Sequence, residues 1–465
     1  MSDWLDAEGH ADRAFEMYER GRWAEAESEL RKALSLNPDQ AEWHFNLGLT
    51  LEAAGRDAEA LSSYERAVEL MPDQVDPILA AGIVANRLDL CQRAVELFQQ
   101  VLRIDPRSEA AYANKIDSHV RLGEHDEAET TYFLSQQALE EPSAACLASI
   151  AESLIERKLY ARAAWCLKEA LRLDPGIPRL LARLGAVYAS MGKPQRALQL
   201  YLRDLRDDPG NIDTLLDYGE LLLDLDRLPE AAEKFRRVLE LQPANVDAHM
   251  RLGEIAMRSR RYEEAHLEFE LVLKLDREYP LVRLWLADAM IRRSKIEEAR
   301  QCLLTELNLL EGACLTPSQR EDAEDLAQDW LLDELIRFGS LLLEAGLPHE
   351  AARVFERAAV SADDDLPAAQ RADLYRHLAV ARFAVNDLGG GVSASRSVLR
   401  YEPRCIASIH NLALAALQEG RLAVCNAWIK RGLSIDRHDD GLRRLRIRLW
   451  FAAARAVLRK LTFRH

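Results

Sequence analysis

Residues 216–243 read LDYGELLLDLDRLPEAAEKFRRVLELQP, and this stretch decides the fold because close variants of it recur along the chain. Two of them are FNLGLTLEAAGRDAEALSSYERAVELMP at 45–72 and ARLGAVYASMGKPQRALQLYLRDLRDDP at 182–209. Each ends in proline, and such prolines lie 34 residues apart at Pro38, Pro72 and Pro106 and again at Pro175, Pro209 and Pro243. A constant period of this length predicts an array of repeated structural units.

Small residues recur at two positions of the unit when its closing proline is numbered as position 32. Position 8 holds Ala14, Gly48, Gly82, Ala151, Gly185, Gly219, Gly253, Ala287, Gly339, Ala379 and Ala413. Position 20 holds Ala26, Ala60, Ala94, Ala128, Ala163, Ala197, Ala231, Ala265, Ala299 and Ala351. Glycine inside a helix costs about 1 kcal/mol relative to alanine, so its recurrence needs a packing reason. Two helices that cross closely supply that reason, and we expect both positions to be contacts between paired helices.

The second helix of a unit carries a large side chain at position 24 and a smaller apolar one three residues later, which is the spacing of one buried helix face. Position 24 holds Tyr64, Phe98, Tyr132, Tyr201, Phe235, Phe269 and Phe355. At this periodic spacing we expect the aromatics to form the core rather than a ligand site. Glycines fall between the two helices at Gly21, Gly55, Gly123, Gly192, Gly346 and Gly420. There we expect helix C-terminal caps with positive φ.

This pattern resembles that of the tetratricopeptide repeat family, whose 34-residue units are pairs of short amphipathic helices. The resemblance implies an all-α fold, a right-handed superhelical solenoid of about twelve helix-turn-helix repeats with a C-terminal capping helix. The units begin near Ala7, Ala41, Val75, Glu109, Ala144, Pro178, Ile212, Val246, Pro280, Leu332, Ala372 and Ile406.

The register of the repeats breaks after the ninth unit, and a second irregular stretch follows the tenth unit at 361–370. The first break and the basic end of the chain divide it into four predicted segments. Residues 1–310 form an array of about nine repeats, and 311–331 form an insertion that joins this array to the third segment. That third segment, residues 332–440, forms about three degenerate repeats, and 441–465 form a basic amphipathic capping helix. Within the insertion, Thr316-Pro317 and Ser318 with Glu321 predict the capped start of a helix.

The composition narrows the class of protein. The chain has 465 residues and a formal net charge of −16, which argues against nucleic acid as a partner because phosphate binding needs clustered Lys and Arg. Scattered cysteines without a CxxC pair, and histidines without ligand spacing, argue against a disulfide framework and a metal site. The repeats use nearly every residue, so we expect neither enzymatic activity nor a cofactor. An acidic N-terminus without a long apolar run favours a cytoplasmic protein.

Position 9 of the first helices carries acids in the middle of the array. From the fourth unit to the ninth it reads Asp117, Glu152, Ala186, Glu220, Glu254 and Asp288. This position points away from the packed face of the helix, and in the family that other face lines a concave groove. We therefore predict a groove whose acidic centre binds a protein or peptide partner, basic or extended. In the first three units, position 9 holds Phe15, Leu49 and Ile83, which we expect to form an apolar anchor at one end.

Two features leave alternatives open. The acids of position 9 are also explained as a solvated face of an acidic protein. Residues 441–465 contain eight basic residues and no acid, while residues 1–440 carry 53 basic and 77 acidic side chains. A repeat array needs a last helix to cover its open end, which explains the apolar side of this segment. Its basic side also suits an anionic membrane surface or an acidic partner, such as the groove of another copy.

Taken together, these patterns predict a non-catalytic scaffold for protein-protein interaction that works through a concave, centrally acidic groove. The alternatives are a structural or membrane-peripheral assembly factor that acts through its basic C-terminal helix, and a regulatory subunit of a separate enzyme. The sequence leaves the oligomeric state open.

Overall fold

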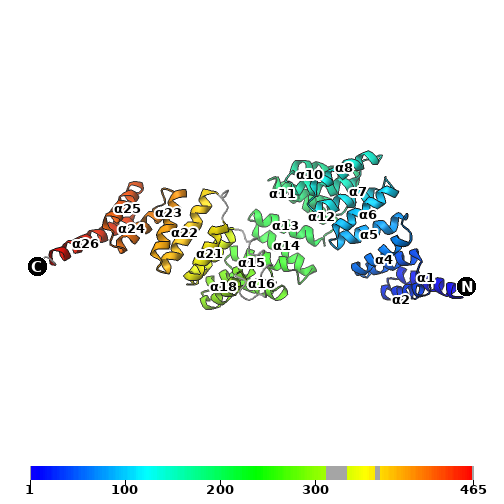
Figure 1. Cartoon of the computed structure of the whole chain (residues 1–465), viewed down its shortest axis with the longest axis horizontal. Coiled ribbons are helices and arrows are strands. Elements are labelled where there is room, and N and C mark those ends of the chain that lie inside the picture. Colours follow the sequence, from blue (N-terminus) through cyan, green and yellow to red (C-terminus); the bar gives the residue numbers. More distant parts are fainter. Residues whose placement is uncertain (1, 311–331, 362–366, 463–465) are drawn as a thin grey trace. The chain divides into compact units, whose positions relative to one another are not determined.

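The computed structural model describes residues 2–310, 332–361 and 367–462. These residues form 25 helices, and no strand occurs among them (Figure 1). The predicted all-α fold is confirmed for this part of the chain. The insertion at 311–331, with its predicted helix start, lies outside the described residues, so the four-segment division of the chain stays a prediction.

Twelve helix pairs follow one another, and a thirteenth first helix ends the described chain. In order, they are α1 (Ser2–Glu19) and α2 (Trp23–Leu36), α3 (Ala41–Ala53) and α4 (Asp57–Leu70), α5 (Val75–Arg87) and α6 (Cys91–Ile104), α7 (Glu109–Arg121) and α8 (His125–Ala138), α9 (Ala144–Glu156) and α10 (Tyr160–Leu173), α11 (Leu180–Ser190) and α12 (Pro194–Asp207), and α13 (Ile212–Asp224) and α14 (Leu228–Leu241). They continue with α15 (Val246–Arg258) and α16 (Tyr262–Leu275), α17 (Val282–Arg292) and α18 (Ile296–Leu310), α20 (Leu332–Glu344) and α21 (Pro348–Ser361), α22 (Ala368–Ala384) and α23 (Leu388–Tyr401), α24 (Ile406–Gln418) and α25 (Leu422–Ile435), and α26 (Asp440–Thr462).

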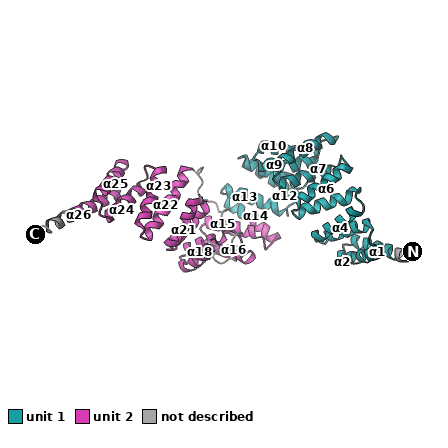
Figure 2. Ribbon diagram, viewed as in Figure 1, with its two compact units in different colours: residues 1–234 teal, residues 235–465 magenta. Residues whose placement is uncertain are grey.

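The helices group into two compact units, residues 1–234 and residues 235–465 (Figure 2). The boundary falls inside α14, between Lys234 and Phe235. It therefore does not coincide with any of the segment boundaries that the repeat register predicts.

Local sequence sets where the helices begin and where the chain turns. The side chains of Ser108, Ser143 and Asn211 accept hydrogen bonds from backbone N–H groups three residues later, at the starts of α7, α9 and α13. The six glycines predicted to have positive φ between paired helices all have it. At the same turn, the other pairs use Asp89, Lys158, Asp226, Arg260, Ser294 and Asn386, also with positive φ.

The glycines of position 8 make room for the aromatic rings of position 24. A Cβ added to Gly82 would lie 2.5 Å from the Phe98 ring, and one added to Gly185 would lie 2.9 Å from the Tyr201 ring. Such distances are too short for carbon atoms in contact, so these crossings require glycine. The prediction that position 24 forms the core is confirmed for every ring except that of Tyr132, which is only half-buried.

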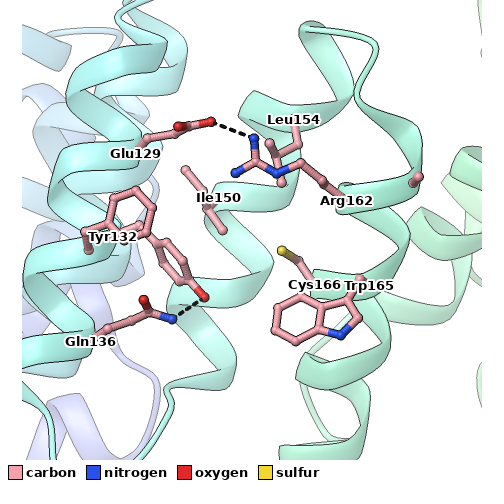
Figure 3. A pocket seen from close by; sticks show the side chains of 10 residues that line it. Glu129, Tyr132, Gln136, Ile150, Leu154, Arg162, Trp165 and Cys166 are labelled. Atoms are coloured by element: carbon pink, nitrogen blue, oxygen red, sulfur yellow. Dashed lines mark hydrogen bonds and ion pairs between the residues drawn. The ribbon is translucent and has the colours of Figure 1, made fainter.

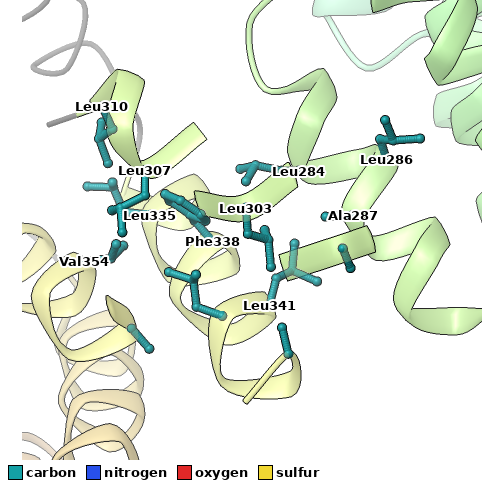
Figure 4. Close-up of a cluster of buried hydrophobic side chains, with 14 of the residues drawn as sticks. Leu284, Leu286, Ala287, Leu303, Leu307, Leu310, Leu335, Phe338, Leu341 and Val354 are labelled. Carbon is teal, nitrogen blue, oxygen red and sulfur yellow. The ribbon is translucent and has the colours of Figure 1, made fainter. Parts of the chain in front are cut away.

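In residues 235–465, one hydrophobic cluster continues from the ninth helix pair to the tenth (Figure 4). Leu307 and Leu310 of α18 belong to the same cluster as Leu335 and Phe338 of α20. The helix pairs on the two sides of residues 311–331 therefore share a core, and the tenth pair packs on the ninth as a repeat does.

The last helix, α26, covers the end of the array as predicted. Leu442, Leu445 and Leu449 are buried in a cluster with residues of α24 and α25. The opposite side of α26 carries Trp450 and Phe451, which are 66% and 55% exposed.

Candidate functional site

Two of the three residues predicted to form the apolar anchor lie together in the structure. Phe15 on α1 and Leu49 on α3 line one shallow pocket of about 60 Å³, together with Tyr18 and Asn46. Phe15 is 60% exposed, so a ligand could contact its ring. Ile83 is half-buried on α5 and does not line this pocket.

The acids of position 9 in the first compact unit, residues 1–234, differ in their surroundings. Asp117 on α7 is half-buried, and burial raises the pKa of its carboxyl while the nearby Arg121 lowers it. Glu152 on α9 forms a 2.5 Å ion pair with Arg183 of α11. Glu220 on α13 is exposed. The carboxylates of position 9 therefore differ in burial and do not form a uniform row.

In the second compact unit, residues 235–465, both acids of position 9 are nearly buried and paired with arginines. The Glu254 side chain is 10% exposed and pairs with Arg251 at 3.2 Å and Arg258 at 2.6 Å. Asp288, 15% exposed, pairs with Arg292 at 3.0 Å and with Arg337 of the next first helix at 3.3 Å.

Arg337 also lies over an aromatic ring. Its guanidinium carbon is 3.5 Å from the centre of the Trp285 ring, a cation–π geometry. Burial lowers the pKa of Arg337, while Asp288 opposes that shift. The two residues therefore hold this arginine in place from two directions.

The prediction from sequence counted acids and missed these arginines, although their positions carry a readable signal. Arg121, Arg258 and Arg292 each follow an acid of position 9 by four residues, which is the spacing of an ion pair on one helix. Arg183 and Arg337 occupy position 6 of the repeat that follows the acid. From that repeat's first helix, Arg183 contacts Glu152 and Arg337 contacts Asp288 on the first helix before it.

A larger cavity lies between the second helices α8 and α10, with α9 as its floor (Figure 3). Its volume is about 410 Å³, within the rough range of 300–1,000 Å³ that is typical of ligand pockets. It is lined by Glu129, Tyr132, Phe133, Gln136, Ile150, Leu154, Ala161, Arg162, Trp165 and Cys166. Phe133 is 52% exposed and Trp165 is 60% exposed, so the walls present aromatic surface to a ligand.

One exchange in the repeat pattern explains this cavity. In the fourth pair, position 8 is Ile116, which is fully buried, instead of glycine or alanine. Because the ring of position 24 lies against position 8 in the glycine pairs, a branched side chain occupies the space that the Tyr132 ring would fill. Tyr132 instead lines the cavity. The sequence showed the mismatch, but the prediction treated Tyr132 as core.

Polar groups border the cavity. The Glu129 carboxylate accepts hydrogen bonds from Arg157 at 3.2 Å and from Arg162 at 3.4 Å, so it links α8 to α10 (Figure 3). The Gln136 amide donates to the Tyr132 hydroxyl at 2.9 Å. Burial raises the pKa of the Cys166 thiol to about 11, which keeps it protonated and a poor nucleophile at neutral pH. Because these polar groups are paired with one another and the thiol is uncharged, the rest of the cavity wall is suited to binding apolar groups.

No helix in the described ranges is long and apolar enough to cross a membrane. Within the same ranges, no group of three or more His, Cys, Asp or Glu residues is placed to hold a metal ion.

Stacked helix pairs with a 34-residue period define a helical repeat protein. A family model described as tetratricopeptide repeat matches residues 11–75, 79–138 and 216–280, and a second model of the same description matches 180–213. The chain therefore contains tetratricopeptide repeats over these ranges.

Solved structures of other proteins resemble the chain over different lengths. A tetratricopeptide repeat protein from Parabacteroides merdae is 16% identical, with 62% of this chain and 99% of that chain covered and a TM-score of 0.41. TTC0263, a thermophilic TPR protein of Thermus thermophilus, is 23% identical, with 40% and 100% covered and a TM-score of 0.36. Yeast Tom70 is 15% identical, with 97% and 96% covered and a TM-score of 0.37. No curated protein matches the chain.

Proposed function

We propose that this chain is a non-catalytic scaffold that binds a protein or peptide partner along the predicted groove of its first helices. Tetratricopeptide repeat proteins act in general as protein-interaction scaffolds, and repeat arrays of this kind present extended binding surfaces. The finer question is which part of the groove receives the partner and what charge the partner carries.

An excess of negative charge on α13 carries the proposal. Asp217 is half-buried, and burial is the largest cause of its raised pKa. The neighbouring acids Glu220 and Asp213 raise the pKa further, while Arg179 opposes them. Asp213 and Asp217 share the single cation Arg179, at 3.0 and 3.8 Å. A Lys or Arg from a partner would add positive charge beside these two carboxylates and favour their charged forms.

The acids of position 9 in the second compact unit are less available to such a partner. Glu254 and Asp288 are nearly buried and already contact two arginines each. A partner's basic group would have to displace these arginines and leave them without their carboxylates, which is costly for buried pairs. The basic segment therefore binds at α13, with the pair of Glu152 and Arg183 on the neighbouring helices as a second contact.

The pocket at Phe15 and Leu49 serves as a separate apolar anchor for the same partner. Its volume of about 60 Å³ suits a small aliphatic side chain. A partner of this chemistry has a basic stretch and, at some distance along its sequence, an apolar residue.

Capture of partners from a native lysate tests the proposal. We expect the full-length chain to retain a partner that the double variant Asp217→Asn and Glu220→Gln loses. Glu233→Gln is the matched control, because this α14 side chain is 71% exposed and lies outside position 9. Binding should weaken steeply between about 0.05 and 0.5 M salt, since the Debye length falls well below 10 Å over that range. Equal capture by the double variant, or an affinity that does not change with salt concentration, would contradict the proposal.

A second candidate function, that of an assembly factor, is favoured by the exposed side of α26. There Trp450 and Phe451 lie beside the exposed Arg444 and Arg448. Such a surface suits an anionic membrane or another protein. Flotation of the full-length chain with phosphatidylcholine vesicles, with and without phosphatidylserine, tests the membrane form of this candidate. Equal binding to both kinds of vesicle removes it.

A further inference from the structure

The exposed side of α26 is an apolar stripe without a partner helix in the described chain. Ile447, Trp450 and Phe451 are 58%, 66% and 55% exposed, and they follow the i, i+3, i+4 spacing of one helix face. The Trp450 and Phe451 rings contact each other edge to face at 5.0 Å. At 100° per residue, Arg444, Arg448 and Arg455 fall together along one side of this stripe. We call these six residues the α26 stripe.

The cavity between α8 and α10 has the complementary form. It is elongated along α8, because Glu129, Tyr132, Phe133 and Gln136 follow helical i, i+3, i+4, i+7 spacing. Two parallel walls and an apolar floor make a groove of the kind that accepts an amphipathic helix through anchors spaced in this way.

Charge distinguishes the two walls of the cavity. Residues 122–156, which include all of α8, contain eight acids and no Lys or Arg. Asp126, at the start of α8, and Glu140, just beyond its end, have side chains that are 96% and 76% exposed. Each pairs with one arginine, Arg157 at 3.5 Å and Arg107 at 2.6 Å. Such exposed pairs contribute little to stability, so these carboxylates still attract a further cation. The α10 wall instead contributes Arg162, which Glu129 already contacts. A basic helix therefore fits with its positive side along α8 and its apolar side toward the floor.

We propose that the α26 stripe of one copy of this chain docks into the α8–α10 cavity of a second copy. Trp450 and Phe451 fill the cavity between Tyr132 and Trp165, and the arginines of the stripe face the acids of α8. Buried aromatic anchors of this kind dominate the binding energy of protein interfaces. Because the two contacting surfaces differ, the association is head-to-tail and leaves a free cavity and a free stripe at its ends.

This association predicts a molar mass that grows with concentration. Sedimentation equilibrium of the full-length chain should show dimers and larger species that dissociate as salt is raised. Trp450→Ala on the stripe and Trp165→Ala in the cavity should each weaken self-association at least tenfold. Leu267→Ala is the matched control, because this α16 side chain is 52% exposed and belongs to neither surface. A monomeric mass of the wild-type chain at every concentration overturns the proposal.

A mixing experiment identifies the two surfaces as partners of each other. The Trp450→Ala chain keeps an intact cavity, and the Trp165→Ala chain keeps an intact stripe. At a concentration where the wild-type chain is mostly dimeric, each variant alone should be mostly monomeric, whereas an equal mixture should form dimers and no larger species. If the mixture also stays monomeric, the two surfaces do not bind each other.

The same variants separate this inference from the other functions of the chain. Asp217→Asn with Glu220→Gln should lose the captured partner and keep self-association. If Trp450→Ala abolishes binding to phosphatidylserine vesicles while the wild-type chain is a monomer, α26 binds membranes and the inference is overturned.

Discussion

Gly82 and Phe98 show how a single pair of residues fixes the crossing of two helices. The ring of Phe98 is fully buried and lies where a Cβ of residue 82 would be. The five helix pairs with alanine at position 8 have a smaller side chain at position 24: Ala14 with Leu30, Ala151 with Leu167, Ala287 with Leu303, Ala379 with Ser395 and Ala413 with Ile429. The chain therefore contains two solutions to the same packing problem, glycine with an aromatic ring and alanine with a smaller side chain, most often leucine.

This coupling predicts a non-additive pair of substitutions. Gly82→Ala should lower the free energy of unfolding by about 1–3 kcal/mol, because the new methyl group forces the Phe98 ring out of place. In the Phe98→Leu background the same change should cost at least about 0.5 kcal/mol less. Urea unfolding of the four chains, followed by circular dichroism, measures the coupling.

Gly9→Ala is the control for that cycle. Gly9 lies in α1 with nothing within 4 Å of an added Cβ, so alanine there should stabilise the helix by up to about 1 kcal/mol. Equal costs of Gly82→Ala in the two backgrounds of residue 98 would show that the ring does not set the crossing.

At the residue scale, the sequence predicts the contacts that recur in every repeat better than the positions that depart from the pattern. The recurrence of small and large residues identified the buried contacts, and the turn glycines have the expected φ. The displaced Tyr132 was not predicted, because periodic spacing alone does not show that Ile116 competes for the same space. The arginines beside the acids were also missed, since Arg337 reaches Asp288 from another helix.

At the scale of the element, the first helix pair is joined by one carboxylate. Glu29 on α2 contacts His10 and Arg13 of α1 at 2.6 and 3.1 Å and Lys32 of its own helix at 2.6 Å. The hydrogen bonds of Lys32 and then of His10 lower the pKa of Glu29 to about 2. Its ordinary value is 4.5, so the charged form is favoured by folding.

This lowered pKa predicts an acid-sensitive contact between α1 and α2. Its contribution to stability is fully present above pH 4.5 and is lost as the pH falls toward about 2, because the proton binds more tightly to the unfolded chain. Hydrogen exchange of α1 should therefore accelerate more between pH 5 and pH 3 in the wild type than in Glu29→Gln, after correction for intrinsic rates. An identical acceleration in both chains would exclude this role of Glu29.

Element boundaries follow the sequence less closely than the element order does. Units were predicted to begin near Pro178 and Pro280, but α11 and α17 begin at Leu180 and Val282. In both cases the residue before the helix has positive φ, at Arg179 and Leu281. The periodic pattern gives the centre of each helix, whereas the conformation of one linking residue decides its first turn.

At the scale of the whole molecule, the order of helix pairs was predictable because each repeat carries its own pattern. The division into two compact units was not, since it falls within α14 and reflects contacts summed over many helices. The continuous core of α18 and α20 likewise could not be inferred from an insertion that interrupts the register between them. Both features depend on how repeats stack, which no single repeat encodes.

Stacking also predicts how damage spreads through the array. Repeats contact mainly their neighbours, so the stability of each depends on its own pair and the adjoining interfaces. Gly82→Ala, in the third pair, should therefore raise amide exchange most in α5 and α6, less in α3, α4, α7 and α8, and not measurably in α20 to α25. Gly339→Ala is the reciprocal control, because an added Cβ would lie 2.5 Å from the Phe355 ring in the tenth pair. It should affect α20 and α21 and spare α5 and α6. Exchange that rises equally in all helices for either variant would mean that the array unfolds as one cooperative body rather than repeat by repeat.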